Sequence, residues 1–188
     1  GADADSAAPV LLEFLQRFGS KANLHVHVHA VLSDGCFLVR RGALVFEPAA
    51  APTSDEVEAM VVQIKRRVIR RFLRLGAITP EIAAEIMARE HSGFSLHAAT
   101  CVAADDREGL KRLLQYCTRP AIALKRMQYL PDKELVRYAP LKTQPGEPVV
   151  VEWHALEFLS RFSKLVPPPW LNLVRYAGAL GPRSPLRP

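Results

Sequence analysis

Residues 24–29, at the start of the segment 24–32, alternate strictly between apolar side chains and histidine, and this alternation restricts the fold more than any other stretch of the chain. The segment reads LHVHVHAVL. Successive side chains of a β-strand point to opposite faces of a sheet, so a strand here places His25, His27 and His29 on one face and the valines on the other. We therefore expect a strand that carries a row of imidazoles on one face.

Such a row has two interpretations. A buried imidazole needs polar partners, and three of them on one face would need several partners at once. Neutral imidazole is also a common ligand of divalent cations, and side chains two residues apart on a strand can converge on one ion. The row therefore predicts either a metal site or a set of histidines satisfied by the surrounding protein.

The other periodicities predict a mixture of helices and strands. Residues 10–18 have apolar side chains at helical spacing and precede Gly19, which favours a short helix with a glycine cap. CFLVR and ALVFE flank Arg41-Gly42 and would extend the histidine strand into a β-meander. Further along we expect helices at about 54–75, 79–90 and 105–118, a strand at 94–103, a short helix ending near Met127, a hairpin over 135–152 and a helix over 154–165. This irregular order predicts an α+β fold with a largely antiparallel sheet.

The helix expected at 54–75 has a strong start signal. Thr53 or Ser54 can cap it, and acidic residues fill its first turn. Its apolar positions keep a 3.6-residue period, and lysine and arginine fill much of the remainder. This basic face is either a DNA-contacting surface or an ordinary solvated helix face.

Charge and cysteine usage limit the class of protein. Residues 111–188 hold thirteen basic and five acidic side chains, the sign expected of a surface that faces a polyanion, although proteins that never bind nucleic acid can show it too. The three cysteines are widely spaced and form no Cys-x-x-Cys pair, which indicates a reducing compartment.

No apolar run approaches the roughly 18 residues of a membrane span, and residues 1–9 lack the pattern of a signal peptide. We expect a cytoplasmic, nucleoid-associated protein with no membrane contact.

Tyr116 is a second candidate for chemistry. It lies in LKRLLQYCTRP, near the end of the helix expected at 105–118. Tyrosines at the edge of an amphipathic helix usually pack the ring and hydrogen-bond the hydroxyl, so periodicity by itself favours a structural role.

Three segments of the chain resemble a known family. They are QRFGSKANLHVHVHAVLSDGCF at 16–37, SGFSLHAATCVAADDREGLKRLLQYCTRPAIALKRM at 92–127, and EFLSRFSKLVPPPWLNLVRYAGALGPRSPLR at 157–187. In this order they are similar to the rolling-circle insertion-sequence transposases of the HUH endonuclease superfamily. The resemblance spans nearly the whole chain.

This resemblance implies particular roles. The family's metal-binding pair of histidines falls on His27 and His29, while His25 stands where an asparagine is expected. The family nucleophile is a tyrosine before an Arg-Pro pair, a place that Tyr116 occupies here. Arg112 stands four residues earlier, where two-tyrosine relatives carry their other tyrosine, so the chain resembles the single-tyrosine branch.

The implied reaction nicks single-stranded DNA at the ends of a mobile element. A phenol is a poor nucleophile at neutral pH, so Mg²⁺ or Mn²⁺ beside it would offset charge on the scissile phosphate. Attack would leave a 5′-phosphotyrosine and a free 3′-hydroxyl. Because the covalent intermediate conserves the bond energy, a later hydroxyl can reseal the strand without a nucleotide cofactor.

Two histidines would bind a cation weakly, so we expect a third ligand. The candidates are His97, which is as readily a satisfied core histidine, and His25. Phosphate contacts are expected from the basic side chains around the tyrosine, because they cluster near the proposed nucleophile. They are Arg112, Arg119, Lys125 and Arg126.

We expect a nuclease core over 1–130 and a basic C-terminal segment over 131–188 packed on it.

Two alternatives to the transposase hypothesis remain. A Cys-rich zinc-binding region expected before the histidine strand is missing, and Ala177 stands where relatives have a histidine. Both departures suit a truncated or decayed DNA-binding remnant. The second alternative is a histidine metalloenzyme that acts on a small molecule.

Overall fold

The structure is a computed structural model that describes residues 7–90, 93–140, 145 and 150–187. It divides into two compact units. The first combines residues 1–49 with residues 107–188, and the second comprises residues 50–106.

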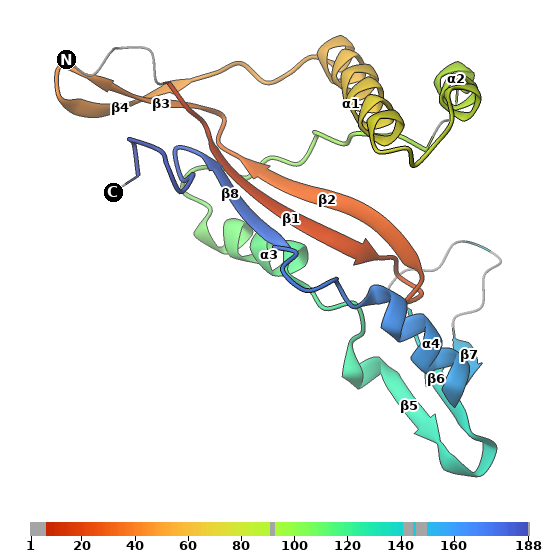
Figure 1. The fold of residues 1–188 in the computed structure, drawn as a ribbon. Coiled ribbons are helices and arrows are strands. Elements are labelled where there is room, and N and C mark those ends of the chain that lie inside the picture. The colour runs from red at the N-terminus through yellow and green to blue at the C-terminus, as the bar shows by residue number, and fades with distance from the viewer. Residues whose placement is uncertain (1–6, 91–92, 141–144, 146–149, 188) are drawn as a thin grey trace. The chain divides into compact units, whose positions relative to one another are not determined.

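A three-stranded antiparallel sheet forms the centre of the first unit (Figure 1). Strand β1 (Val10–Phe18) lies between β2 (Leu24–Leu32) and β8 (Val174–Gly178). Residues near the two ends of the sequence are therefore hydrogen-bonded neighbours in one sheet. The alternating segment forms the expected strand, β2.

The helix expected at residues 10–18 is wrong, because this segment is β1. Its apolar spacing fits a helix, but as the central strand it hydrogen-bonds to a neighbour on each side. Pairing with residues distant in sequence overrides a local helical periodicity. Strand β8 was not predicted, and it supplies one of these two neighbours.

Strands β3 (Gly35–Arg40) and β4 (Ala43–Pro48) form a separate hairpin. Both residues of its turn have positive φ, 51° at Arg41 and 79° at Gly42, as a type I′ turn requires. The two expected strands are confirmed, but β3 does not pair with β2. The expected meander is therefore wrong, since β2 turns back onto β1 instead.

A second three-stranded sheet has the order β5-β6-β7. Its strands are β5 (Met127–Leu130), β6 (Leu135–Tyr138) and β7 (Val151–His154), and β7 leads directly into helix α4 (Ala155–Leu165). Tyr138, Trp153 and Leu165 form a buried cluster with Ala22 from the β1–β2 turn. This cluster joins the second sheet and α4 to the end of the central sheet. The hairpin from 135 and the helix near 154–165 are confirmed, whereas β5 was not predicted.

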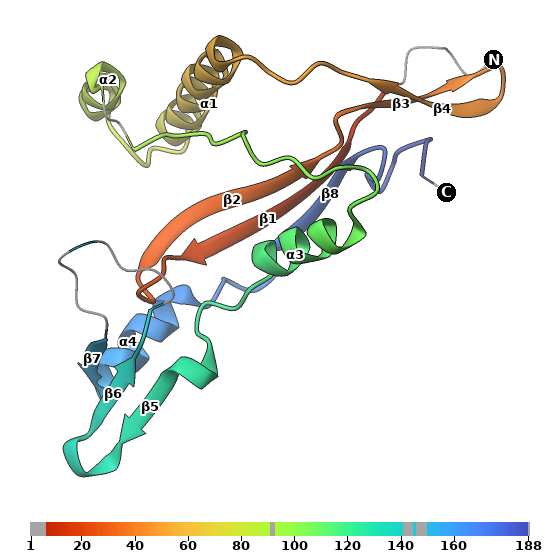
Figure 2. The ribbon, with the colours of Figure 1, turned by 180° about the vertical axis from the view of Figure 1, so that it is seen from behind.

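The remaining helix of the first unit, α3 (Arg107–Cys117), confirms the helix expected there. It lies on one side of the central sheet, as Figure 2 shows from behind. A short 3₁₀ helix, η1 (Leu124–Arg126), follows it.

The second unit contains α1 (Ser54–Arg74) and α2 (Pro80–Ala88). Thr53 and Glu56 form a reciprocal capping box at the start of α1, and Thr79 caps α2, as the sequence predicts. The Lys65 ammonium links the helices by donating to the carbonyl oxygens of Met87 and Arg89, at 3.1 and 3.3 Å.

The strand expected at 94–103 is wrong. These residues form neither helix nor strand, and most are exposed. A strand needs a hydrogen-bonding partner, and the described part of the second unit has only helices as regular elements. The α+β class itself is confirmed, with antiparallel pairing throughout. Within the described residues, no helix is long and apolar enough to cross a membrane.

Candidate active site

The histidine row lies on the more covered face of β2. His27 and His29 are half-buried, whereas Val26 and Val28, on the opposite face, are exposed. The ring centroids of His25 and His27 lie 5.1 Å apart, and those of His27 and His29 lie 4.9 Å apart. The alternation therefore places the three rings in a row along one face, with His25 at the exposed end.

Strand β1 adds a polar side chain to this face. The antiparallel register places Gln16 opposite His27 and Phe14 opposite His29, and directly paired residues share a face. Gln16 is only 4% exposed. A buried amide therefore lies beside the imidazole row.

The C-terminal end of α3 is held against the same face. Gln16 Nε2 donates to the Cys117 carbonyl oxygen at 2.7 Å. The Tyr116 ring then lies edge-on to His29, with centroids 5.1 Å apart and planes at 70°. Tyr116 keeps 41% of its surface exposed, so a substrate can approach a phenol that adjoins the row.

Arg119 lies over the ring of this tyrosine. Its guanidinium carbon lies 4.7 Å from the centroid of the Tyr116 ring, within the range of a cation–π interaction. The positive charge therefore adjoins both the phenol and the imidazole that contacts it.

Three buried polar atoms around this site have no hydrogen-bond partner among the described residues. They are Gln16 Oε1, His29 Nε2 and Arg119 Nε. An unpaired buried polar group costs about 1–3 kcal/mol and is uncommon in native proteins. Two of these atoms, Gln16 Oε1 and His29 Nε2, belong to the histidine face.

The protonation state of His29 suits metal binding. Burial lowers the pKa of His29, and the neighbouring His27 and Arg119 lower it further. His29 therefore favours the neutral form, which has a nitrogen lone pair. His27 Nδ1 lies 3.0 Å from the His25 carbonyl oxygen; if it donates there, Nε2 is left as the acceptor nitrogen.

These donors fit a divalent cation. Gln16 Oε1 offers a neutral oxygen, and the His27 and His29 Nε2 atoms offer two nitrogens; oxygen suits Mg²⁺, while Mn²⁺ also accepts imidazole. No group of three or more His, Cys, Asp or Glu side chains within the described residues could hold a metal ion. A site with Gln16 would therefore bind weakly by itself and would need substrate oxygens to complete it.

The structure brings four of the expected residues together within the first unit. His27, His29, Tyr116 and Arg119 form one contact group. Arg112 lies one helical turn before Tyr116 on α3, whereas Lys125 and Arg126 lie on η1. His97 belongs to the second unit, where it is exposed on a segment without helix or strand.

Gln16 is the site residue that sequence reasoning missed. A helix at 10–18 gives this side chain no relation to the histidines. The usable signal was a tight turn over 19–23 between two strands, because a hairpin would have placed Gln16 opposite the row.

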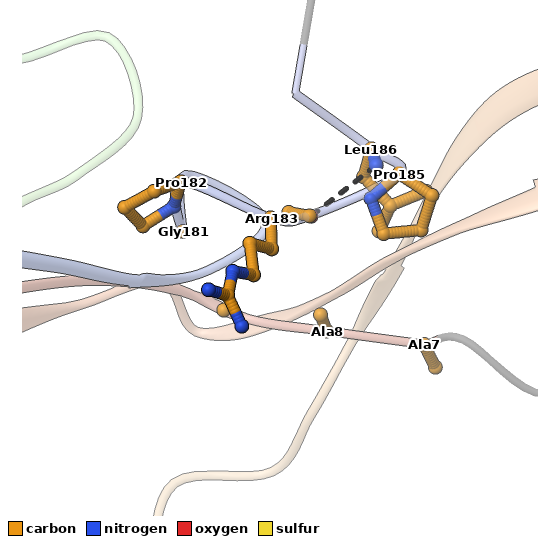
Figure 3. A pocket seen from close by; sticks show the side chains of 9 residues that line it. Ala7, Ala8, Gly181, Pro182, Arg183, Pro185 and Leu186 are labelled. Atoms are coloured by element: carbon orange, nitrogen blue, oxygen red, sulfur yellow. Dashed lines mark hydrogen bonds between the residues drawn. The ribbon is translucent and has the colours of Figure 1, made fainter.

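A separate pocket of about 590 Å³ lies near the start of β1 and the end of β8. Ala7, Ala8, Gly178 and residues 181–186 line it (Figure 3). Arg183 is the charged side chain among these lining residues. None of the histidine-face residues contributes to its walls, so this pocket is distinct from the site around Tyr116.

Comparison with known proteins identifies a family. Residues 11–186 match the sequence model of a family described as "Putative transposase". No curated protein and no solved structure matches the chain.

Proposed function

The chain belongs to this transposase family, and from the family and the site geometry we propose that it cuts and rejoins single-stranded DNA with Tyr116 as nucleophile. The observation that carries the proposal is the contact between Tyr116 and His29, with ring centroids 5.1 Å apart. The same contact supports the HUH type of rolling-circle transposase, in which a metal-bound histidine pair faces a tyrosine.

The proposed reaction is a transesterification. The Tyr116 hydroxyl oxygen attacks a DNA phosphorus and the bond from phosphorus to the 3′ oxygen breaks. The segment downstream of the cut stays on the tyrosine through its 5′ phosphate, and the upstream segment leaves with a 3′-hydroxyl. The phenol loses its proton and the departing 3′ oxygen gains one, so the step needs no net acid or base. Attack by a 3′-hydroxyl on the phosphotyrosine reverses these changes and reseals the strand.

The surrounding residues would orient and stabilise the reacting groups. Arg119 would oppose negative charge on the phenol oxygen and on the phosphate. Gln16 fixes the end of α3 through the Cys117 carbonyl and so limits where the Tyr116 ring can lie. A site fixed in this way reduces the reorganisation needed during attack.

Gln16, His27 and His29 would hold the Mg²⁺ or Mn²⁺ ion. When bound there, the ion would polarise the scissile phosphate and offset its charge. Low affinity suits this role, because phosphate oxygens would then complete the coordination. Arg112, Lys125 and Arg126 would bind neighbouring phosphates and position the strand.

The test is covalent trapping with a pool of random-sequence single-stranded oligonucleotides. The wild-type chain should form an adduct that survives denaturing electrophoresis, in the presence of Mn²⁺ or Mg²⁺ but not of a chelator. Tyr116→Phe should abolish the adduct. Tyr129→Phe, a matched change at an exposed tyrosine on β5, should leave it unchanged.

Three outcomes would overturn the proposal. DNA binding without any metal-dependent adduct would identify a non-catalytic remnant of the family. Stoichiometric retention of zinc without DNA binding would favour a small-molecule metalloenzyme. An adduct that persists in Tyr116→Phe would show that another residue is the nucleophile.

A further inference from the structure

Trp170 is the most exposed large apolar side chain described, at 97%. It lies between α4 and β8, directly after three consecutive prolines. Its φ is 67°, in the left-handed region that bulky residues rarely occupy. The ring therefore lies in solvent on a backbone conformation that disfavours it.

The segment around Trp170 is fixed on both sides. Arg17 Nη1 donates to the Val166 carbonyl oxygen at 2.6 Å, and the Leu15 amide donates to the Leu173 carbonyl oxygen at 2.8 Å. Within the turn, the Leu171 amide donates to the Pro168 carbonyl oxygen at 3.3 Å. Prolines 167–169 restrict the backbone further. Both anchors come from β1, so the central sheet fixes the place at which the ring is displayed.

Packing does not explain this arrangement. Backbone strain persists where the surrounding structure enforces it, and it concentrates at sites of recognition or catalysis. Burial of the indole would repay the strain, but almost none of the indole is buried. A binding partner that covers the exposed ring would account for this arrangement.

The charge near this turn indicates a polyanionic partner. Residues 155–187 contain five basic side chains, Arg161, Lys164, Arg175, Arg183 and Arg187, and Glu157 as their one acidic residue. Arg161 pairs with Glu157, whereas no ion pair joins Lys164 to any residue that the structure describes.

A groove lined in part by polar side chains adjoins the anchored turn. It has a volume of about 320 Å³ and lies between the β1–β2 turn and α4, lined by Ala22, Asn23, Leu24, Glu157, Ser160, Arg161 and Lys164. Lys164 is two residues before Val166, whose carbonyl anchors the turn. Asn23, Ser160 and Lys164 offer hydrogen-bond donors of the kind that bind phosphate and sugar oxygens.

We propose that Trp170 stacks on an unpaired nucleobase of single-stranded DNA and that Lys164, in the adjoining groove, binds its backbone phosphate. Aromatic stacking combined with a nearby cation is the usual way to hold single strands without reading their sequence. β8, which follows Trp170, belongs to the sheet that carries the histidine row. This inference rests on the proposed function, because it names a contact for the same substrate.

Intrinsic fluorescence can test the stacking directly, because the chain has two tryptophans in contrasting environments. Trp153 is 8% exposed and stacks on Tyr138, whereas Trp170 is almost fully exposed. Titration of Tyr116→Phe with oligothymidine should quench the solvent-exposed emission without cleavage. Trp170→Phe should remove that emission and its quenching.

Affinity measurements supply the second readout. Trp170→Ala should weaken oligothymidine binding by roughly 5- to 150-fold, the loss typical of one stacked base. Tyr129→Ala, the matched loss of an exposed aromatic on β5, should leave affinity unchanged. Lys164→Gln should reduce the slope of log K against log salt by about 0.7, as expected for one lost single-strand phosphate contact.

These results separate failure of the inference from failure of the proposed function. If the wild-type chain forms no adduct but DNA still quenches the Trp170 emission, the nuclease proposal fails and the binding site at Trp170 stands. Adduct formation with no quenching, or with equal affinity in Trp170→Ala, would overturn the stacking site alone. Equal quenching of the Trp170 emission by fully paired duplex DNA would also overturn it. So would a blue shift of that emission on anionic vesicles together with no change of the emission on addition of DNA.

Discussion

Replacement of Gln16 by leucine tests the link between the central sheet and the nucleophile. The change keeps the approximate size of the side chain but removes both the Nε2 donor and the Oε1 acceptor. Loss of the 2.7 Å bond leaves the Cys117 carbonyl without this donor, which costs about 1–3 kcal/mol. Loss of the unpaired Oε1 offsets part of this cost, because a buried unsatisfied acceptor disappears.

The expected net loss of stability is about 1 kcal/mol. For a chain of this length that corresponds to a fall of about 2–4 °C in Tm, measurable by circular dichroism. The effect on catalysis should be larger. A displacement of about 1 Å at the nucleophile can cost about 100-fold in rate. The rate of adduct formation should therefore fall by much more than the roughly fivefold change in the folding equilibrium that about 1 kcal/mol represents.

A metal titration separates the two proposed roles of Gln16. If Oε1 holds the cation, Gln16→Leu should raise the Mn²⁺ concentration needed for half-maximal adduct formation by at least about tenfold. Gln16→Glu should lower that requirement relative to Gln16→Leu, because it restores a ligand oxygen and adds charge. A normal adduct rate in Gln16→Leu at every Mn²⁺ concentration would refute both roles, whereas a normal rate reached only at raised Mn²⁺ would refute the positioning role alone.

Three further predictions concern packing and the protonation of a thiol. Gly178→Ala should lower the free energy of unfolding by more than about 3 kcal/mol, since a Cβ there would meet the Pro9 carbonyl oxygen at 1.8 Å. Gly42→Ala should cost only about 1–2 kcal/mol, the penalty of a left-handed backbone for alanine, because no atom lies within 4 Å of a Cβ at that position. Equal Tm values for these variants would contradict the β1–β8 pairing. Burial raises the pKa of the Cys117 thiol, so its alkylation should be slower than that of the exposed Cys101 and should accelerate only at higher pH. Mass spectrometry measures both modifications, and equal modification of the two thiols at pH 7 would show that Cys117 is not buried. Thr53→Ala removes the α1 capping box and should cost about 1 kcal/mol, and a Tm unchanged by this variant would indicate that the box contributes nothing.

Local sequence determined the features that depend on neighbouring residues. Alternation at 24–32 placed His25, His27 and His29 on one face because side chains of a strand point to alternate sides. Thr53 and Thr79 marked the starts of α1 and α2 because a cap acts on amides two or three residues away. The α+β class followed from the succession of such elements.

Tertiary structure decided every feature that depends on residues distant in sequence. Residues 10–18 became the central strand because β2 and β8 pair with them, and no pattern within those residues encodes these partners. Residues 94–103 have the pattern of a strand but pair with no strand in the part of the chain that the structure describes. Gln16 reached the histidine face through the register of β1 on β2, and Tyr116 met His29 because α3 packs on that face. Pairing and packing energies arise only when such segments meet, which is why the nucleophile was identified in the sequence by resemblance and its surroundings only in the fold.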